Sequence, residues 1–270
     1  MGFKRKLRET TARNNSLLCV GLDPDREKMP AGVGIAQFNR AIVDATSDLV
    51  CAYKPNLAFY EAEGLEGLRA LEETIAHIPP DIPIIGDAKR GDIGNTARMY
   101  ARALFDVFGF DAVTLNPYLG LDSVEPFIAY TKKGLFLLCR TSNPGARDFQ
   151  DLEVDGQPFY ERVAFKAVDW NVHGNIGLVV GATYVQELAR IRQLCPDMPL
   201  LIPGVGSQGG DLPQVVKRGT DKSGANAIIN ASRAVLYAST GPDFAEAART
   251  AATDLRDSIN QHRRPVRRNV

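Results

Sequence analysis

The chain has 270 residues, of which 44% are hydrophobic and 24% charged, enough for a substantial core in one large domain. Its 32 basic and 32 acidic residues cancel, which argues against a nucleic-acid binder, because such proteins normally present a basic face. No apolar run is long enough for a membrane span or signal peptide, and the four cysteines form no CxxC pair. We therefore expect a cytoplasmic protein with reduced thiols.

Short apolar runs alternate along the chain with segments of helical periodicity. Because these runs are continuous rather than alternating, they are typical of strands buried on both faces. Eight strands are expected, at 17–23, 50–56, 82–89, 112–116, 134–141, 176–182, 200–205 and 227–232. Helices are expected at 4–13, 35–48, 57–77, 95–108, 123–131, 159–171, 184–194, 212–218 and 244–259. The Asn95-Thr96 pair is expected to cap its helix.

Eight strand–helix pairs at this length favour an α/β fold of the (β/α)₈ type, a TIM barrel, with residues 4–13 as an extra N-terminal helix. We expect residues 1–270 to form one domain, with residues 258–270 as a frayed tail. A doubly wound sheet is the alternative. It would call for a GxGxxG turn after the first strand, and Gly21-Leu22-Asp23-Pro24 does not match that pattern.

Charged residues gather at the expected carboxyl ends of the first three strands, where barrels of this kind carry their chemistry. Asp23 ends the first strand, Lys54 lies on the second, and Asp87 and Lys89 end the third, with Asp92 in the following loop. Strand side chains alternate, so Asp87 and Lys89 should point to the same side. Each residue alone also has a structural interpretation: a rim salt bridge for the lysines, a helix cap for Asp92, a turn for Asp23. Together they indicate a buried, functional charge cluster.

The last two strands predict a phosphate site. The seventh strand runs into the glycine-rich segment 203–210, and the eighth ends next to Arg233. Glycine lets backbone N–H groups approach a phosphate closely, and arginine adds a bidentate contact. The structural alternative is a flexible loop beside a surface arginine.

Several motifs resemble those of the orotidine 5'-phosphate decarboxylase family, and the resemblance covers the whole chain. The segment 87–96 resembles the family's DxKxxDI signature with its following threonine, and 203–211 its phosphate loop. Gly21-Leu22-Asp23-Pro24 is similar to the first-strand motif. The segment 53–61 is similar to the second-strand motif of the longer bacterial (type 2) subfamily.

The resemblance implies decarboxylation of orotidine 5'-phosphate to UMP, the last step of de novo pyrimidine nucleotide synthesis, without cofactor or metal. The catalytic network would be Lys54, Asp87, Lys89 and Asp92. Lys89 would protonate the pyrimidine C6 as CO₂ leaves, and Asp23 and Lys54 would contact the ribose hydroxyls.

The resemblance also implies a homodimer, in which Asp92, Ile93 and Thr96 reach the neighbouring site. Ser142, with Thr141 and Asn143 as alternatives, would bind the pyrimidine edge. The phosphate would be held by Gln208, Arg233 and the backbone amides near Gly209 and Arg233.

Three other functions remain open at this point. One is a metal-dependent sugar-phosphate decarboxylase or aldolase on the same barrel, with the DxKxxD residues holding magnesium. Another is a Schiff-base aldolase that uses Lys54 or Lys89. The third is a non-catalytic sensor of a phosphate ligand, which would not need two lysines and two aspartates packed together.

Overall fold

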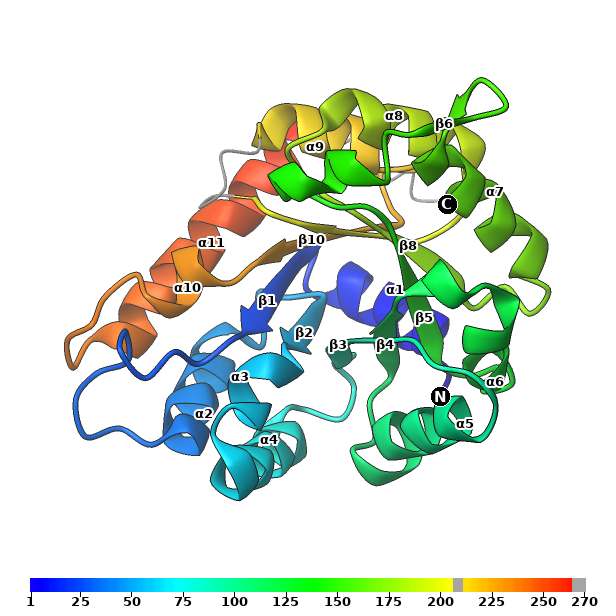
Figure 1. The fold of residues 1–270 in the computed structure, drawn as a ribbon. Coiled ribbons are helices and arrows are strands. Elements are labelled where there is room, and N and C mark those ends of the chain that lie inside the picture. Colours follow the sequence, from blue (N-terminus) through cyan, green and yellow to red (C-terminus); the bar gives the residue numbers. More distant parts are fainter. Residues whose placement is uncertain (206–210, 264–270) are drawn as a thin grey trace.

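A computed structural model describes residues 1–205 and 211–263. Its main sheet has eight parallel strands in the order β2-β1-β10-β9-β8-β5-β4-β3 (Figure 1). The strands are β1 (Leu18–Leu22), β2 (Ala52–Pro55), β3 (Ile85–Arg90), β4 (Ala112–Leu115), β5 (Gly134–Arg140), β8 (Ile176–Val180), β9 (Leu200–Pro203) and β10 (Ala227–Ala231). Two isolated parallel bridges, Tyr53 to Ile84 and Asn56 to Asp87, join β2 to β3. The sheet therefore closes into the expected (β/α)₈ barrel, and the doubly wound alternative is wrong.

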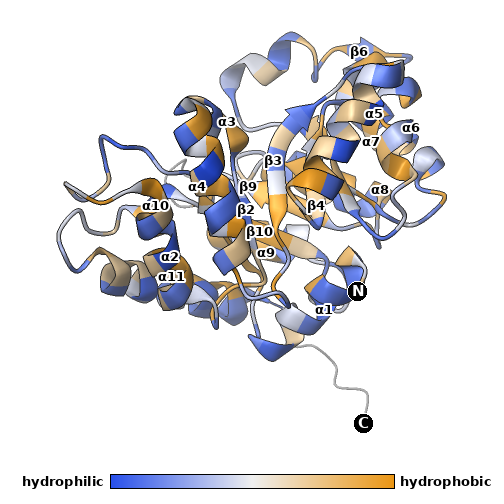
Figure 2. Cartoon of the chain, turned by 90° about the horizontal axis from the view of Figure 1, so that it is seen from below, coloured by the Kyte–Doolittle hydropathy of each residue, from blue (hydrophilic) through white to orange (hydrophobic). Residues whose placement is uncertain are grey.

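Helices cover the outside of the barrel (Figure 1). They are α1 (Phe3–Arg13), α2 (Ile35–Thr46), α3 (Leu57–Glu61), α4 (Gly64–His77), α5 (Gly94–Arg102), α6 (Glu125–Ile128), α7 (Phe159–Trp170), α8 (Val185–Leu194), α9 (Leu212–Gly219), α10 (Arg233–Leu236) and α11 (Phe244–His262). Figure 2 shows hydrophobic residues concentrated toward the barrel and hydrophilic residues on the outer helix surfaces. Burial of this apolar surface is the main favourable contribution to folding.

The N-terminal helix α1 closes the amino end of the barrel. Phe3 is buried and meets Phe136 of β5 edge to face, with ring centroids 5.8 Å apart. Gly134 makes this possible, because a Cβ there would lie 2.4 Å from the Phe3 ring. On the same helix, the Lys6 ammonium lies 2.6 Å from the Asp111 carboxylate. The helix therefore forms the floor of the barrel.

Three expected helices differ from the prediction. Of the segment 123–131, only Glu125–Ile128 is α-helical, as α6. The segment 57–77 divides into α3 and α4, and Gly64 at the junction has a φ of +61°, which glycine adopts readily. The predicted Asn95-Thr96 cap is wrong: both residues lie inside α5, whose N-cap is Ile93 without a side-chain cap. The chain then continues as one π-helical turn, Ala103–Val107.

Short elements that the sequence did not predict fall in the loops. They are the 3₁₀ turns Pro117–Leu119, Leu121–Ser123 and Pro144–Asp148, the antiparallel hairpin of β6 (Glu153–Val154) and β7 (Gln157–Pro158), and the short helix α10 after β10. The last of these turns and the hairpin belong to the long connection after β5, which borders the site described below.

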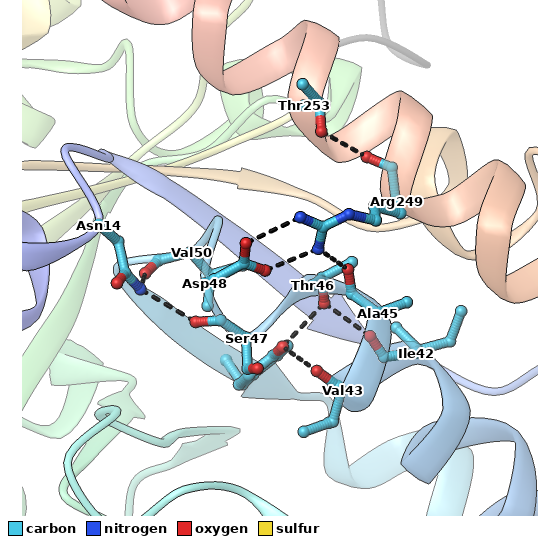
Figure 3. A network of polar contacts seen from close by, with 11 residues as sticks. Asn14, Ile42, Val43, Ala45, Thr46, Ser47, Asp48, Val50, Arg249 and Thr253 are labelled. Atoms are coloured by element: carbon cyan, nitrogen blue, oxygen red, sulfur yellow. Dashed lines mark hydrogen bonds and ion pairs between the residues drawn. The ribbon is translucent and has the colours of Figure 1, made fainter.

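The final helix packs against α2. Residues 258–262, expected to be frayed, belong to α11, and Ile259 is fully buried; residues 264–270 lie outside the described part. Figure 3 shows Arg249 of α11 donating to both carboxylate oxygens of Asp48, at 2.7 and 2.8 Å, and to the Ala45 carbonyl at 2.7 Å. The same figure shows Asn14, after α1, donating to two carbonyls of the turn after α2. These contacts fasten α11 and α1 to the end of α2.

Candidate active site

Two cavities open side by side at the carboxyl ends of the strands. One, of about 380 Å³, is bordered by Asp23 and Arg233. The other, of about 510 Å³, is bordered by the connection that follows β5. Lys54, Asp87 and Pro203 line both cavities, so the two meet at the charged residues of β2 and β3. An elongated ligand with two different ends would fit this shape.

Asp87 lies at the centre of the predicted charge cluster. Its Oδ2 accepts a hydrogen bond from Lys54 Nζ at 2.8 Å, and its Oδ1 accepts one from Lys89 Nζ at 2.5 Å. The Thr114 hydroxyl of β4 also donates to Oδ1, at 2.9 Å. Only 4% of Lys54 is exposed, so one lysine is enclosed while the other, on the cavity side, remains accessible. The structure thus brings Lys54, Asp87 and Lys89 together as predicted.

The electrostatics keep this cluster charged. Burial alone raises the pKa of Asp87, but Lys54 and Lys89 outweigh it and hold that pKa well below the usual range of a carboxyl group. Burial alone lowers the pKa of Lys54, but Asp87 and Asp23 outweigh it and raise that pKa. The carboxylate and the buried ammonium are therefore ionised at neutral pH.

Lys89 has an unusual backbone. Its φ is +48°, in the left-handed region that non-glycine residues rarely adopt, and its N–H donates to the Thr114 hydroxyl at 3.0 Å. The pairing of β3 with β4 shifts register between Gly86 and Arg90, on either side of this residue. The irregular end of β3 aims the Lys89 ammonium back at Asp87. The two side chains meet as expected, although simple strand alternation does not fully describe the geometry.

The first cavity is lined by three of the predicted ribose and phosphate residues, Asp23, Lys54 and Arg233. Asp23 lies directly after β1, and its Oδ1 is buried without a hydrogen-bond partner among the described residues. The Tyr237 hydroxyl fixes the backbone here by donating to the Asp23 carbonyl at 2.7 Å. Arg233, exposed, begins α10 at the rim, and Gly204 has a φ of +98°. Gln208 and Gly209, predicted for the phosphate, lie outside the described residues.

The second cavity is bordered by the segment predicted to contact a pyrimidine. Ser142, Thr141 and Asn143 all line it, together with Leu138 and Phe149. The Thr141 hydroxyl donates to Asn143 Oδ1 at 2.7 Å and accepts from Gln150 Nε2 at 2.8 Å. Of the three candidates, Thr141 and Asn143 therefore already bind each other.

Asp92, Ile93 and Thr96 are not drawn into this cluster. Asp92 Oδ1 accepts the Ile93 N–H at 2.8 Å, and none of the three residues lines either cavity. Ile93 is 56% exposed and Thr96 is also exposed. Within one chain, Asp92 therefore does not join Asp87 and Lys89 as the sequence suggested. Asp87 is instead bound by Lys89 and Lys54.

A sequence model of the "Orotidine 5'-phosphate decarboxylase / HUMPS family" matches residues 16–251. This match covers most of the chain and every charged residue of the cluster. The chain belongs to this family.

Curated relatives extend the match to nearly the full length. An orotidine 5'-phosphate decarboxylase of Cellvibrio japonicus is 56% identical over 271 residues, covering 96% of this chain and 98% of the relative. One from Dehalococcoides mccartyi is 55% identical, covering 98% and 99%. A solved structure of Leishmania donovani OMP decarboxylase matches with a TM-score of 0.87 at 41% identity, covering 97% of this chain and 99% of that one. The family resemblance inferred from the motifs is confirmed.

Sequence reasoning missed several residues of this family member's site. Thr114 is the polar residue of an otherwise apolar strand, β4. Side chains two apart on a strand point to the same side, so Thr114 faces the barrel interior with Ala112, and this alternation could have predicted it. Tyr237 and Gln150 carry no such signal, because each reaches the site from a distant or irregular segment.

Two further observations concern the described part of the chain. It contains no group of three or more His, Cys, Asp or Glu side chains arranged to hold a metal ion. None of the helices it contains is long and apolar enough to cross a membrane.

Proposed function

We propose that this chain decarboxylates orotidine 5'-phosphate to UMP and CO₂, the last step of de novo pyrimidine nucleotide synthesis, without a cofactor. The observation that carries the proposal is Asp87 bound by two lysines where two cavities meet. Relatives of 55% and 56% identity that bear this enzyme's name support it.

The two cavities suit the two ends of the substrate. In the first, Arg233 binds the phosphate, and Asp23 and Lys54 bind the ribose hydroxyls. Gln208 and the amides near Gly209, which the family resemblance assigns to the phosphate, lie outside the described residues. The unpartnered, buried Asp23 Oδ1 is an acceptor of the kind that a hydroxyl group satisfies. The second cavity takes the pyrimidine, with Ser142 at its edge.

The chemistry follows from the charges between the cavities. When the bond between C6 and the carboxylate carbon breaks, CO₂ leaves and the electron pair stays on C6. The Lys89 ammonium stabilises this charge and then gives its proton to C6, so that a C–H bond forms and the lysine is left neutral until solvent reprotonates it. The Asp87 contact fixes the ammonium in place beforehand, so little reorganisation is needed during the reaction.

Asp87 makes a second, smaller contribution. Its carboxylate faces that of the substrate, and two such charges at about 4 Å repel by roughly 1 kcal/mol in water and about 4 kcal/mol at an effective dielectric near 20. The repulsion disappears as CO₂ leaves. Enzymes lower barriers by about 8–23 kcal/mol, so most of the effect must come from Lys89 and from binding energy at the phosphate end.

The proposal includes a cytoplasmic homodimer of single-domain subunits. In it, Asp92, Ile93 and Thr96 of each chain complete the neighbouring site. This is supported by the exposure of Ile93, an apolar residue, and by the position of Asp92 away from its own cluster.

The reaction is tested by following the ultraviolet absorbance of orotidine 5'-phosphate with EDTA present. Wild type should form UMP, and Lys89→Ala should lower kcat by about 10⁴-fold or more, because charge stabilisation and proton delivery are lost together. Lys132→Ala is the matched control, since Lys132 is an exposed lysine beside α1 at the other end of the barrel. No conversion by a folded wild type would reject the proposal and favour the metal-dependent sugar-phosphate alternative.

The shared site is tested by mixing two inactive variants. A Lys89→Ala homodimer lacks Lys89 in both of its sites, and an Asp92→Ala homodimer lacks Asp92 in both of its sites. A mixed dimer has one intact site, so an exchanged mixture should recover about a quarter of wild-type activity. Recovery of none, with mixed dimers shown to form, would contradict a site shared between subunits.

A further inference from the structure

Behind the wall of the second cavity lies a buried arginine. Arg140, the last residue of β5, is fully buried, and its guanidinium lies 3.8 Å from the centre of the Tyr184 ring. One Nη donates to the Thr141 carbonyl at 3.2 Å and to Gln150 Oε1 at 3.3 Å. The other lies 3.2 Å from the Asp151 carboxylate. Burying a guanidinium is costly unless it is paired; these contacts pair both Nη atoms, while Nε has no hydrogen-bond partner among the described residues.

Gln150 connects the buried Arg140 to the segment that lines the cavity. Its Oε1 accepts the Thr141 backbone N–H at 2.8 Å as well as the Arg140 contact. Both partners can only donate, so the amide oxygen must face them and the Nε2 must face the Thr141 hydroxyl, 2.8 Å away. The Thr141 hydroxyl in turn donates to Asn143 Oδ1, which can only accept. Arg140 thus sets the orientation of the amide and, through it, of two further polar groups.

The segment 141–143 is enclosed on its other side as well. Gly181, after β8, packs so closely that a Cβ there would lie 2.7 Å from the Ser142 Cβ. The Gly181 N–H also donates to the Arg140 carbonyl at 2.8 Å. The segment is therefore held between Gln150 and the chain after β8 by hydrogen bonds and close packing.

We propose that Gln150 is a positioning residue for the base-binding cavity: it holds Thr141 through both the backbone N–H and the hydroxyl, and so fixes the segment 141–143 toward the pyrimidine. This rests on the proposed function, because it takes the second cavity as the site of the base. Gln150 acts through Thr141, and Arg140 and Asp151 hold Gln150 in place.

The location of the effect distinguishes positioning from a general contribution to stability. The first cavity, at the ribose and phosphate end, is lined by neither Gln150 nor the segment 141–143. A positioning role therefore changes recognition of the base and leaves recognition of ribose 5-phosphate unchanged. Loss of overall stability would weaken both.

The test compares Gln150→Leu with Gln157→Leu, the same substitution at a glutamine of β7 in the same connection, outside the network. For each variant, the affinities for UMP and ribose 5-phosphate, kcat and KM for orotidine 5'-phosphate, and the unfolding midpoint are measured. Gln150→Leu should weaken UMP binding by about tenfold to a hundredfold and lower kcat/KM similarly, with ribose 5-phosphate affinity within about twofold of wild type. Gln157→Leu should resemble wild type in all of them.

Gln150→Glu tests whether a conservative substitution restores UMP binding, and it replaces Gln150→Leu if that variant does not fold. It keeps an acceptor for the Thr141 N–H and Arg140, replaces the donor to the hydroxyl with a second acceptor, and adds a negative charge that Arg140 can pair with, so it should recover most of the UMP affinity. If Gln150→Leu does not fold, the same comparison of the two ligands is made with Gln150→Glu, where a small loss confined to UMP supports the proposal. Equal losses for both ligands, or unchanged UMP affinity in a folded Gln150→Leu protein, would overturn it.

A wild type that binds both ligands but forms no UMP would overturn the proposed reaction, while the binding comparison would still decide the role of Gln150.

Discussion

The barrel buries a lysine–aspartate pair at each of its two ends, and the two pairs are chemically alike. At the amino end, Lys6 and Asp111 lie 2.6 Å apart with side chains 11% and 17% exposed. At the carboxyl end, Lys54 and Asp87 lie 2.8 Å apart with side chains 5% and 11% exposed. Length and burial alone would not distinguish a structural pair from a catalytic one.

The surroundings of each carboxylate distinguish them. Asp111 Oδ2 accepts one further hydrogen bond, from the Ile84 N–H at 2.9 Å, and so ties α1 to the start of β3. Asp87 instead shares its oxygens with a second lysine and a threonine and faces two cavities. The second lysine and the adjoining cavities support the proposal that the pair at the carboxyl end, unlike the pair at the amino end, belongs to a reaction centre.

The largest expected effect is on activity at the carboxyl end. Lys54→Met keeps the length of the side chain and removes its ammonium, which leaves Asp87 with Lys89 and Thr114. We expect kcat/KM for orotidine 5'-phosphate to fall by about 10³-fold, because a preorganised charge in the site is lost. Steady-state kinetics measures this, with Lys6→Met as the matched control. A loss below tenfold would mean that the two pairs do not differ as proposed.

The corresponding change at the amino end should affect stability instead. Lys6→Met leaves Asp111 with one backbone partner, and we expect the free energy of unfolding to fall by about 3 kcal/mol. Since the site lies at the other end of the barrel, kcat/KM should stay within about twofold of wild type. Urea denaturation and kinetics on the same preparation measure both. A large loss of activity with normal stability would reverse the assignment of the two ends.

Acid pH provides a third test. The pKa of Asp87 is lowered on folding, so its charge contributes stability above the ordinary carboxyl pKa near 4, and that contribution is lost as pH falls below it. The difference in unfolding free energy between wild type and Asp87→Asn should therefore be constant between about pH 5 and 8. It should shrink by more than about 1 kcal/mol toward pH 2. A difference that grows on acidification would contradict the lowered pKa.

The smallest effect is expected at the surface pair that joins α2 and α11. Arg249 and Asp48 make two hydrogen bonds, but their side chains are 47% and 59% exposed. Arg249→Met should cost less than about 1 kcal/mol of stability, and added salt should reduce the difference further. Thermal unfolding at low and high salt measures this. A cost equal to that of Lys6→Met would mean that burial does not decide the strength of these pairs.

The strands and half of the site were predictable from the sequence. Strands of a closed barrel are buried on both faces, so each leaves a continuous apolar run, and every predicted strand lies within three residues of the observed bounds. Lys54, Asp87 and Lys89 could be found because charged residues at the ends of apolar runs are a local property of the sequence, although the irregular backbone that directs Lys89 toward Asp87 was not predicted.

The remainder depends on contacts between segments distant in the chain. Asn95 and Thr96 have the composition of a helix cap, yet the helix begins before them. Arg140 reads as a strand-end residue, and only the approach of Tyr184 and Gln150 reveals its role. Asp92 shows that spacing in a motif does not ensure proximity within one chain, because its carboxylate turns to the next residue instead.

The floor formed by α1 also has a consequence for synthesis on the ribosome. The amino-terminal half of this helix contacts Asp111, Lys132 and Phe136, which are translated more than a hundred residues after Phe3. At rates of about 5–20 residues per second, the helix waits on the order of ten seconds with Phe3 and Leu7 uncovered. The amino-terminal half of the first helix therefore completes its contacts only after β5 has been made, and until then its apolar residues add to the exposed hydrophobic surface that makes folding chains prone to aggregate.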